Sequence, residues 1–168
     1  MSDSSPATSP SPVRKYRARS RLSRLALGGK GRSVRECLQN AAVAVGEMRE
    51  PCLAEIDRCL GILETEFGTG AAGRASRDLD EAYRLTGNII DAAFALPGWN
   101  LDIAGRALCD LVDGFEDAGA TDWPAFDVHV QALRLLRTAG DGLSAKDRAV
   151  IIDGLKAVGR KHGVTELN

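Results

Sequence analysis

The sequence predicts an all-α fold, a four- to five-helix up-and-down bundle preceded by a disordered basic N-terminal tail. Apolar residues recur at intervals of three and four through most of the chain after residue 33, which is the spacing of one helix face. No segment shows the sustained alternation of apolar and polar residues that a half-buried strand requires. Aromatic residues make up only 5% of the chain, which disfavours a β-sandwich and fits a core rich in alanine and leucine.

The composition indicates a soluble protein of one domain plus a tail. The chain has 168 residues, of which 44% are hydrophobic and 27% are charged, an ordinary balance for a globular protein. No apolar run approaches the ~20 residues that a membrane-spanning helix needs. The N-terminus lacks the apolar core of a secretory signal, so we expect a cytoplasmic location.

Charge is distributed unevenly along the chain. Residues 1–32 contain eight lysines and arginines and one aspartate, a net charge of +7, which leaves −8 of the total −1 for the remainder. Residues 1–13 are mainly Ser, Pro, Ala and Thr, which bury too little apolar surface to fold. We therefore expect a disordered basic tail over 1–32, a helical bundle domain over 33–163 and a frayed C-terminus over 164–168.

The basic tail has two open interpretations. It is either a solvated flexible arm, or an electrostatic contact to nucleic acid, anionic lipid or an acidic protein. Tyr16 is its only aromatic residue, which disfavours binding of a single strand by base stacking. The residues that would make an electrostatic contact are Arg14, Lys15, Arg17, Arg19, Arg21 and Arg24.

Several helices are expected, each with one apolar stripe. An apolar pattern runs over 34–66, but Pro51 removes an amide, so we expect a break near 49–51 and a second helix over 51–67. The glycine-rich stretch 68–73 is expected to be a loop. Asp122 and Ser144 are expected N-caps. The further helices are expected over 75–95, 100–117, 123–137 and 144–161.

No residues in the sequence form a recognisable catalytic, cofactor or metal signature. The four cysteines include no CxxC pair, and they are expected to be buried reduced thiols. The carboxylates of 100–117 could bind a cation, but they lack calcium-loop spacing, so a solvated acidic face is favoured. We therefore expect a protein that is not an enzyme and that has no cofactor, no metal and no small-molecule substrate.

The helix expected over 123–137 is apolar on two sides. Phe126, Val130 and Leu133 fall on one face, whereas Val128 and Leu135 fall on the opposite side. A helix with two apolar sides is either buried among other helices or contacts a partner. The expected partner-binding residues are Val128, His129, Arg134, Leu135 and Arg137.

His129 supports an alternative function. An imidazole at the exposed edge of a bundle helix could accept a phosphoryl group from a response regulator, as in histidine-phosphotransfer domains. Those domains place Lys-Gly soon after the histidine, whereas this chain has the small Ala132 and the cationic Arg134. The other interpretation of His129 is a hydrogen-bonded structural or interface histidine.

Five stretches of the sequence bear on a family resemblance. They are Leu79-Asp-Glu-Ala-Tyr-Arg-Leu-Thr-Gly-Asn-Ile-Ile-Asp-Ala-Ala93, Ala107-Leu-Cys-Asp-Leu-Val-Asp113, Asp122-Trp-Pro, His129-Val-Gln-Ala-Leu-Arg-Leu-Leu136 and Asp153-Gly-Leu155. Together they resemble the chemotaxis protein CheE-like family of alphaproteobacteria over roughly residues 50–158. The resemblance implies a cytoplasmic accessory of chemotaxis signalling that acts by protein contact, and it supplies no catalytic residue to carry over.

Three functions are therefore expected, in decreasing order of support. The first is a non-enzymatic helical adaptor or modulator in bacterial chemotaxis or two-component signalling, whose partner is a response regulator or another chemotaxis signalling protein. The second is phosphotransfer through His129. The third is binding of an anionic surface, DNA or lipid, through the basic arm.

Overall fold

The computed structural model describes residues 32–164, and these residues form helices without any strand, which confirms the all-α prediction. The chain divides into two units between Asn40 and Ala41. The long helices are α2 (Val34–Glu47), α3 (Arg49–Ile62), α4 (Leu79–Ala92), α5 (Leu101–Ala118), α6 (Trp123–Ala139) and α7 (Ala145–Lys161). Short helical turns are η1 (Leu63–Phe67), η2 (Arg74–Ser76), η3 (Ala93–Ala95) and η4 (Gly140–Gly142).

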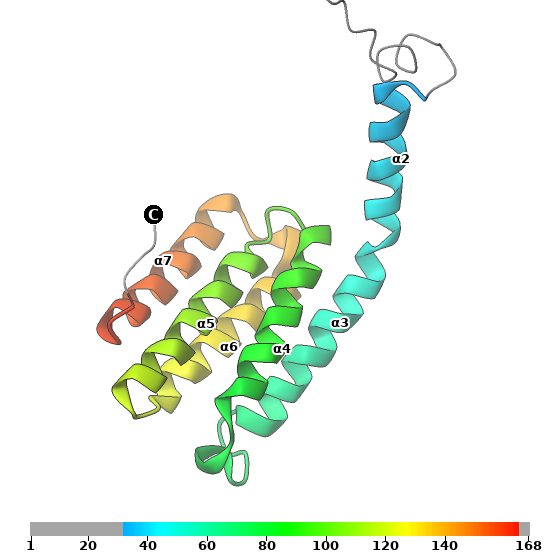
Figure 1. Ribbon diagram of the computed structural model, residues 1–168. Helices are drawn as coiled ribbons and strands as arrows, with labels where there is room; N and C mark the ends of the chain where they lie inside the picture. The colour runs from blue at the N-terminus through cyan, green and yellow to red at the C-terminus, as the bar shows by residue number, and fades with distance from the viewer. Residues whose placement is uncertain (1–31, 165–168) are drawn as a thin grey trace, which may run out of the picture. The chain divides into compact units, whose positions relative to one another are not determined.

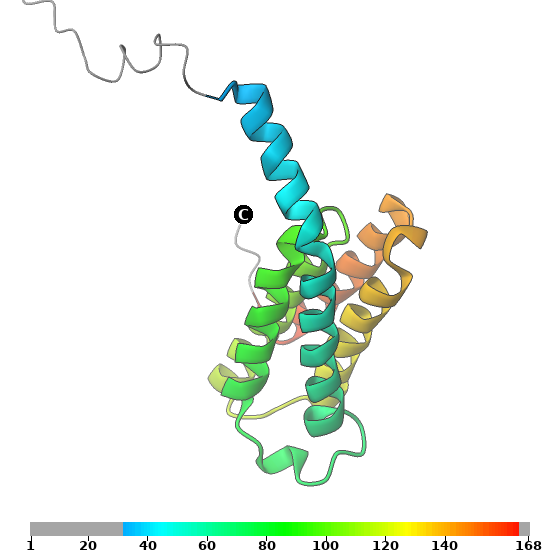
Figure 2. The same ribbon diagram turned by 90° about the vertical axis from the view of Figure 1, so that its right-hand side faces the viewer.

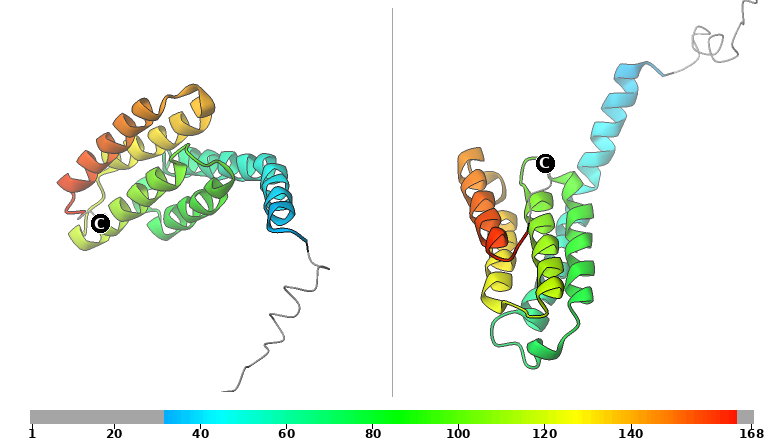
Figure 3. Two further views of the ribbon diagram at one scale, coloured as in Figure 1. Left: turned by 90° about the horizontal axis from the view of Figure 1, so that it is seen from above. Right: turned by 60° about the vertical axis from the view of Figure 1, so that its left-hand side comes forward.

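The five helices α3 to α7 form the predicted up-and-down bundle. Successive helices run in alternating directions, as Figures 1 and 2 show. Helix α5 contacts α4, α6 and α7, and α3 contacts α4 and α6 (Figure 3). Among the described helices, none combines the length and the apolar character needed to cross a bilayer.

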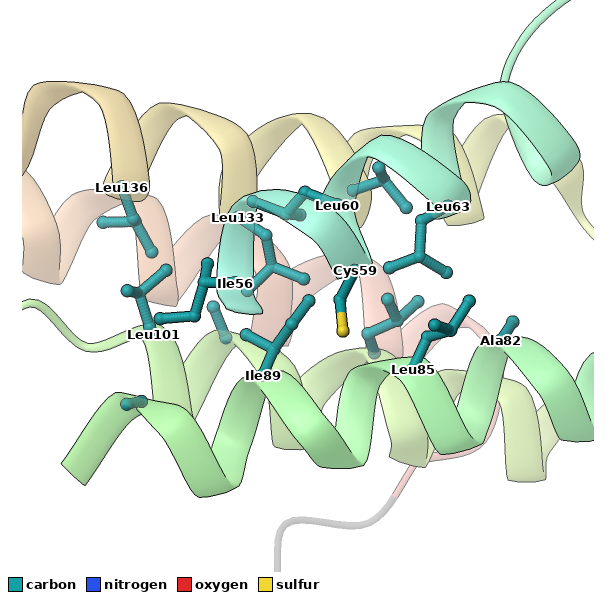
Figure 4. Close-up of a cluster of buried hydrophobic side chains, with 14 of the residues drawn as sticks. Ile56, Cys59, Leu60, Leu63, Ala82, Leu85, Ile89, Leu101, Leu133 and Leu136 are labelled. Carbon is teal, nitrogen blue, oxygen red and sulfur yellow. The ribbon is translucent and has the colours of Figure 1, made fainter. Parts of the chain in front are cut away.

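The bundle core consists mainly of leucine, isoleucine and alanine (Figure 4). The core cluster includes Ile56 and Leu60 from α3, Leu85 from α4 and Leu133 from α6, and all four side chains are fully buried. Because each helix supplies one apolar stripe at helical spacing, the stripes converge on a common interior.

Local signals place several helix ends where the sequence predicts them. Helix α2 ends at Glu47 and α3 begins at Arg49, so the helical run is interrupted close to Pro51. Pro51 lies in the first turn of α3. The Asp122 carboxylate accepts a hydrogen bond from the backbone N–H of Ala125, and Ser144 forms a reciprocal capping box with Asp147.

Helix α4 differs from its prediction in both its start and its buried stripe. It begins at Leu79, later than predicted, because Asp78 caps it after the separate turn η2. The apolar periodicity predicts a stripe through Leu79, Ala82/Tyr83, Thr86, Ile89/Ile90 and Ala93/Phe94. Leu85 is fully buried although it lies outside that stripe, while Tyr83 and Phe94 are 43% and 54% exposed. The stripe is rotated because α3 and α5 both pack on α4, and the directions of its neighbours cannot be read from its own periodicity.

Residues 1–31 and 165–168 lie outside the described residues. The predicted tail, 1–32, and the predicted frayed end, 164–168, therefore remain predictions, apart from Arg32 and Val164 at their edges.

Candidate functional site

The candidate site is the outer face of α6, which we define by Pro124, Val128, Gln131, Leu135 and Thr138. These residues follow one another at intervals of four and three, and all five are exposed. None of them carries a charge. Val128 is 45% exposed and Leu135 is 49% exposed, so two apolar side chains seven residues apart meet solvent on this face. The structure thus places two of the predicted contact residues on one accessible surface.

The opposite side of α6 belongs to the core. Phe126 and Leu133 are fully buried, and Val130 and Leu136 are nearly so. Phe126 packs against the rings of Phe67 and Trp123, with centroid distances of 6.1 and 5.7 Å. This packing fixes the rotation of the helix, and so determines which residues face outward.

His129 lies on the inner side of α6, a position that the sequence left open. Its side chain has no exposed surface, and Nδ1–H donates to the carbonyl oxygen of Ala125 at 2.8 Å. Nε2 has no hydrogen-bond partner among the described residues. Burial lowers the pKa of the imidazole, so the ring is held neutral. A phosphoryl acceptor must reach its donor, and this ring is closed off in the described conformation.

Arg134 and Arg137, which the sequence predicts to lie near a partner, join α6 to α3 and η1 within the chain. Arg134 donates from Nε and Nη2 to the two carboxylate oxygens of Glu64, each at 2.7 Å. Arg137 donates from Nη2 to Asp57 at 2.7 Å, and Arg134 reaches the same carboxylate at 3.4 Å. The pKa of Arg134 is raised by its hydrogen bonds to Glu64. Both guanidinium groups are therefore occupied within the chain.

The first turn of α6 is held by a contact that the sequence did not predict. The Arg74 guanidinium lies 4.7 Å from the ring centroid of Trp123 and donates to Asp127 at 3.0 Å. Thr69 donates from its hydroxyl to the same carboxylate at 2.7 Å. The Arg74 and Asp127 side chains are only 17% and 14% exposed, so this pair is well shielded from solvent.

The far end of α6 is held against the loop between α4 and α5. Gly140 has a φ of +47°, and a Cβ there would lie 2.6 Å from an atom of the Trp99 ring. Trp99 Nε1–H donates to Asp141 at 2.8 Å, and the guanidinium of Arg49 lies 5.0 Å from the Trp99 ring centroid. Contacts with other parts of the bundle thus hold both ends of α6 in place, and with them both ends of the outer face.

All four cysteines are free thiols. Cys52, Cys59 and Cys109 are buried as predicted, but Cys37 is exposed. The exposure of Cys37 corrects the prediction, because α2 buries none of its residues. Burial raises the pKa of Cys59 and of Cys109 to about 11, which keeps both protonated near neutral pH and makes them poor nucleophiles.

The acidic side of α5 lines an open hollow of about 470 Å³ with His162. Its carboxylates are Asp110, Asp113 and Asp117. Burial raises the pKa of Asp110, and the neighbouring charge of Asp113 raises it further. Within residues 32–164, no group of three or more histidine, cysteine or acidic side chains has an arrangement that could hold a metal ion.

The residues of the basic arm, from Arg14 to Arg24, lie outside the described residues, so electrostatic binding by the arm stays a prediction. In comparisons with known proteins, no family model, no curated protein and no solved structure matches this chain. The resemblance to the CheE-like family therefore depends only on the five sequence stretches given under Sequence analysis.

Proposed function

We propose that this protein is a non-enzymatic helical adaptor or modulator in bacterial chemotaxis or two-component signalling. It contacts its partner through the outer face of α6. The observation that carries the proposal is the exposure of Val128 and Leu135, at 45% and 49%, on a face with no charged side chain.

An uncharged face favours protein contact because no ion must be desolvated when a partner covers it. Val128 and Leu135 lie two helical turns apart, roughly 10.5 Å along the axis. Covering the exposed half of each side chain contributes ~1 kcal/mol. Two such anchors on a small face suit a transient signalling contact better than a permanent complex.

The rigidity of α6 supports the same use. The Arg134–Glu64 and Arg74–Asp127 pairs and the packing of Phe126 hold the helix before any partner arrives. A preorganised surface loses little conformational entropy on binding, so more of the contact energy appears as affinity.

The resemblance to the CheE-like family supplies the partner class, a response regulator or another chemotaxis signalling protein in the cytoplasm. Catalysis has no part in the proposal. The thiols of Cys59 and Cys109 are protonated near neutral pH, and the ring of His129 is buried.

The test measures binding of purified response-regulator receiver domains to the full chain by titration calorimetry. We expect Leu135→Glu to weaken binding by about tenfold or more, because it places a charge at the centre of the contact. The matched control is Val150→Glu, where the valine is 64% exposed and belongs to a different helix, α7. Failure of every receiver domain to bind the wild type, or equal loss in both variants, would overturn the proposal.

A further inference from the structure

Helix α2 has 14 residues and none of them is buried. Helices of ~12–15 residues are marginally stable in water unless an apolar face packs against something. Val34 and Leu38 are 77% and 66% exposed, and Val45 is 41% exposed. The stability of α2 in water therefore depends on covering these apolar side chains.

The apolar residues of α2 have the spacing by which helices pair with helices. Val34, Leu38, Ala41, Val45 and Met48 follow one another at intervals of four, three, four and three. This is the heptad spacing of a coiled-coil seam. A single stripe with this period fits another helix more closely than it fits a flat surface.

Charge on α2 is confined to its ends. No charged residue lies between Cys37 and Gly46, so a second helix can approach the middle of α2 without burying an ion. The start of the helix is net basic: Arg32 and Arg35 outweigh Glu36, and they follow a stretch of strongly positive sequence, residues 1–31. Glu47 lies at its other end.

We infer that α2 pairs antiparallel with α2 of a second copy of this chain. Parallel pairing would bring together two N-terminal stretches, residues 1–32, with a net charge of +7 each. Antiparallel pairing instead places the basic start of each α2 beside the acidic end of the other. The orientation is thus determined by charge complementarity, and the seam by the apolar stripe.

In one register of the two helices, apolar residues face each other along the whole seam. When Leu38 faces the second copy's Ala41, Val34 faces the second copy's Val45, and the same layers repeat by symmetry. Each large leucine then lies opposite a small alanine, so the layers fill evenly. In this register Glu47 lies level with the second copy's Arg32.

The experiment measures the oligomeric state of the full chain by sedimentation over a range of concentrations. We expect the wild type to dimerise and Val45→Asp to raise the dimer dissociation constant by about tenfold or more, because the carboxylate enters the seam. The matched control is Val43→Asp, which makes the same replacement at a 61% exposed valine on the far side of α2 and leaves the dimer intact.

A thermal melt followed by circular dichroism accompanies each variant. Both variants keep the bundle, since neither valine is buried. A wild type that stays monomeric at every concentration overturns the inference. So does an equal effect of the two substitutions, which would mean that the stripe is not the seam.

The orientation has its own measurement. Spin labels are placed at Gly46→Cys in a Cys37→Ser background, which keeps Glu47, because Gly46 is exposed and the remaining cysteines are buried. Antiparallel pairing in this register separates the two labelled positions by roughly 20 Å along the axis. Labels side by side would establish parallel pairing and contradict the proposed arrangement.

Discussion

The two sides of α6 are both apolar, but they meet different surroundings. On the inner side, Phe126 and Leu133 are fully buried, whereas on the outer side Val128 and Leu135 are about half exposed. Burying apolar surface stabilises the folded protein, whereas exposed apolar surface contributes free energy only when another molecule covers it. The comparison therefore separates residues whose replacement unfolds the protein from residues whose replacement affects only binding.

The largest expected effect is on the inner side. Phe126→Ala should lower the free energy of unfolding by about 3–5 kcal/mol, because it removes a buried ring and leaves a cavity. Val128→Ala, two residues away on the outer side, should cost less than about 1 kcal/mol. Denaturant unfolding of both variants measures the difference. Similar losses at the two positions would mean that the sides are not distinct.

His129 gives the inner side a dependence on pH. Its folded pKa is lowered by burial, so the unfolded chain takes up a proton first as the pH falls below about 6.5. Stability is therefore fully present above that pH and declines below it, by at most about 1.4 kcal/mol per pH unit.

The measurement is denaturant unfolding at several pH values between neutral and the onset of acid unfolding. His129→Gln cannot titrate and should show a shallower decline. The comparison uses slopes, so a less stable variant remains informative. Equal slopes would show that the ring is accessible to protons in the folded state.

Features that depend on nearby residues were predictable from the sequence. Phe126, Val130 and Leu133 share a face by periodicity alone, and the core position of that face follows. Asp122 and Ser144 cap amides three residues away, so no distant contact is needed to predict them. The outward position of Val128 and Leu135 follows from the same geometry.

Features that depend on distant residues were not predictable. Whether a residue at the edge of a stripe is buried depends on where the neighbouring helix lies, so the sequence could not decide whether His129 is buried. Arg134 and Arg137 bind carboxylates 70 and 80 residues earlier in the chain, at Glu64 and Asp57. Such pairings are set by the packing of α3 on α6, which no local pattern contains.

The ion pair at the edge of α6 should contribute to the free energy of unfolding by an amount between the effects expected on the inner and outer sides of the helix. Arg134 and Glu64 are 33% and 41% exposed, so solvent screens their attraction. A double-mutant cycle with Arg134→Gln and Glu64→Gln should give a coupling energy of about 0.5 kcal/mol that falls as salt is added. A coupling that is zero at low salt would show that the pair does not hold α6 in place.

The smallest effect on stability is expected at Leu135, and it is the sharpest test of the comparison. Leu and Glu have similar helix propensity, and Leu135 is 49% exposed, so Leu135→Glu should change the free energy of unfolding by less than about 0.5 kcal/mol. The same variant is expected to lose binding to the receiver domain. An outer face that serves only stability would show the reverse, a marked loss in denaturant unfolding with binding unchanged. Only a surface kept apolar for a partner lets one substitution spare the fold and remove the contact.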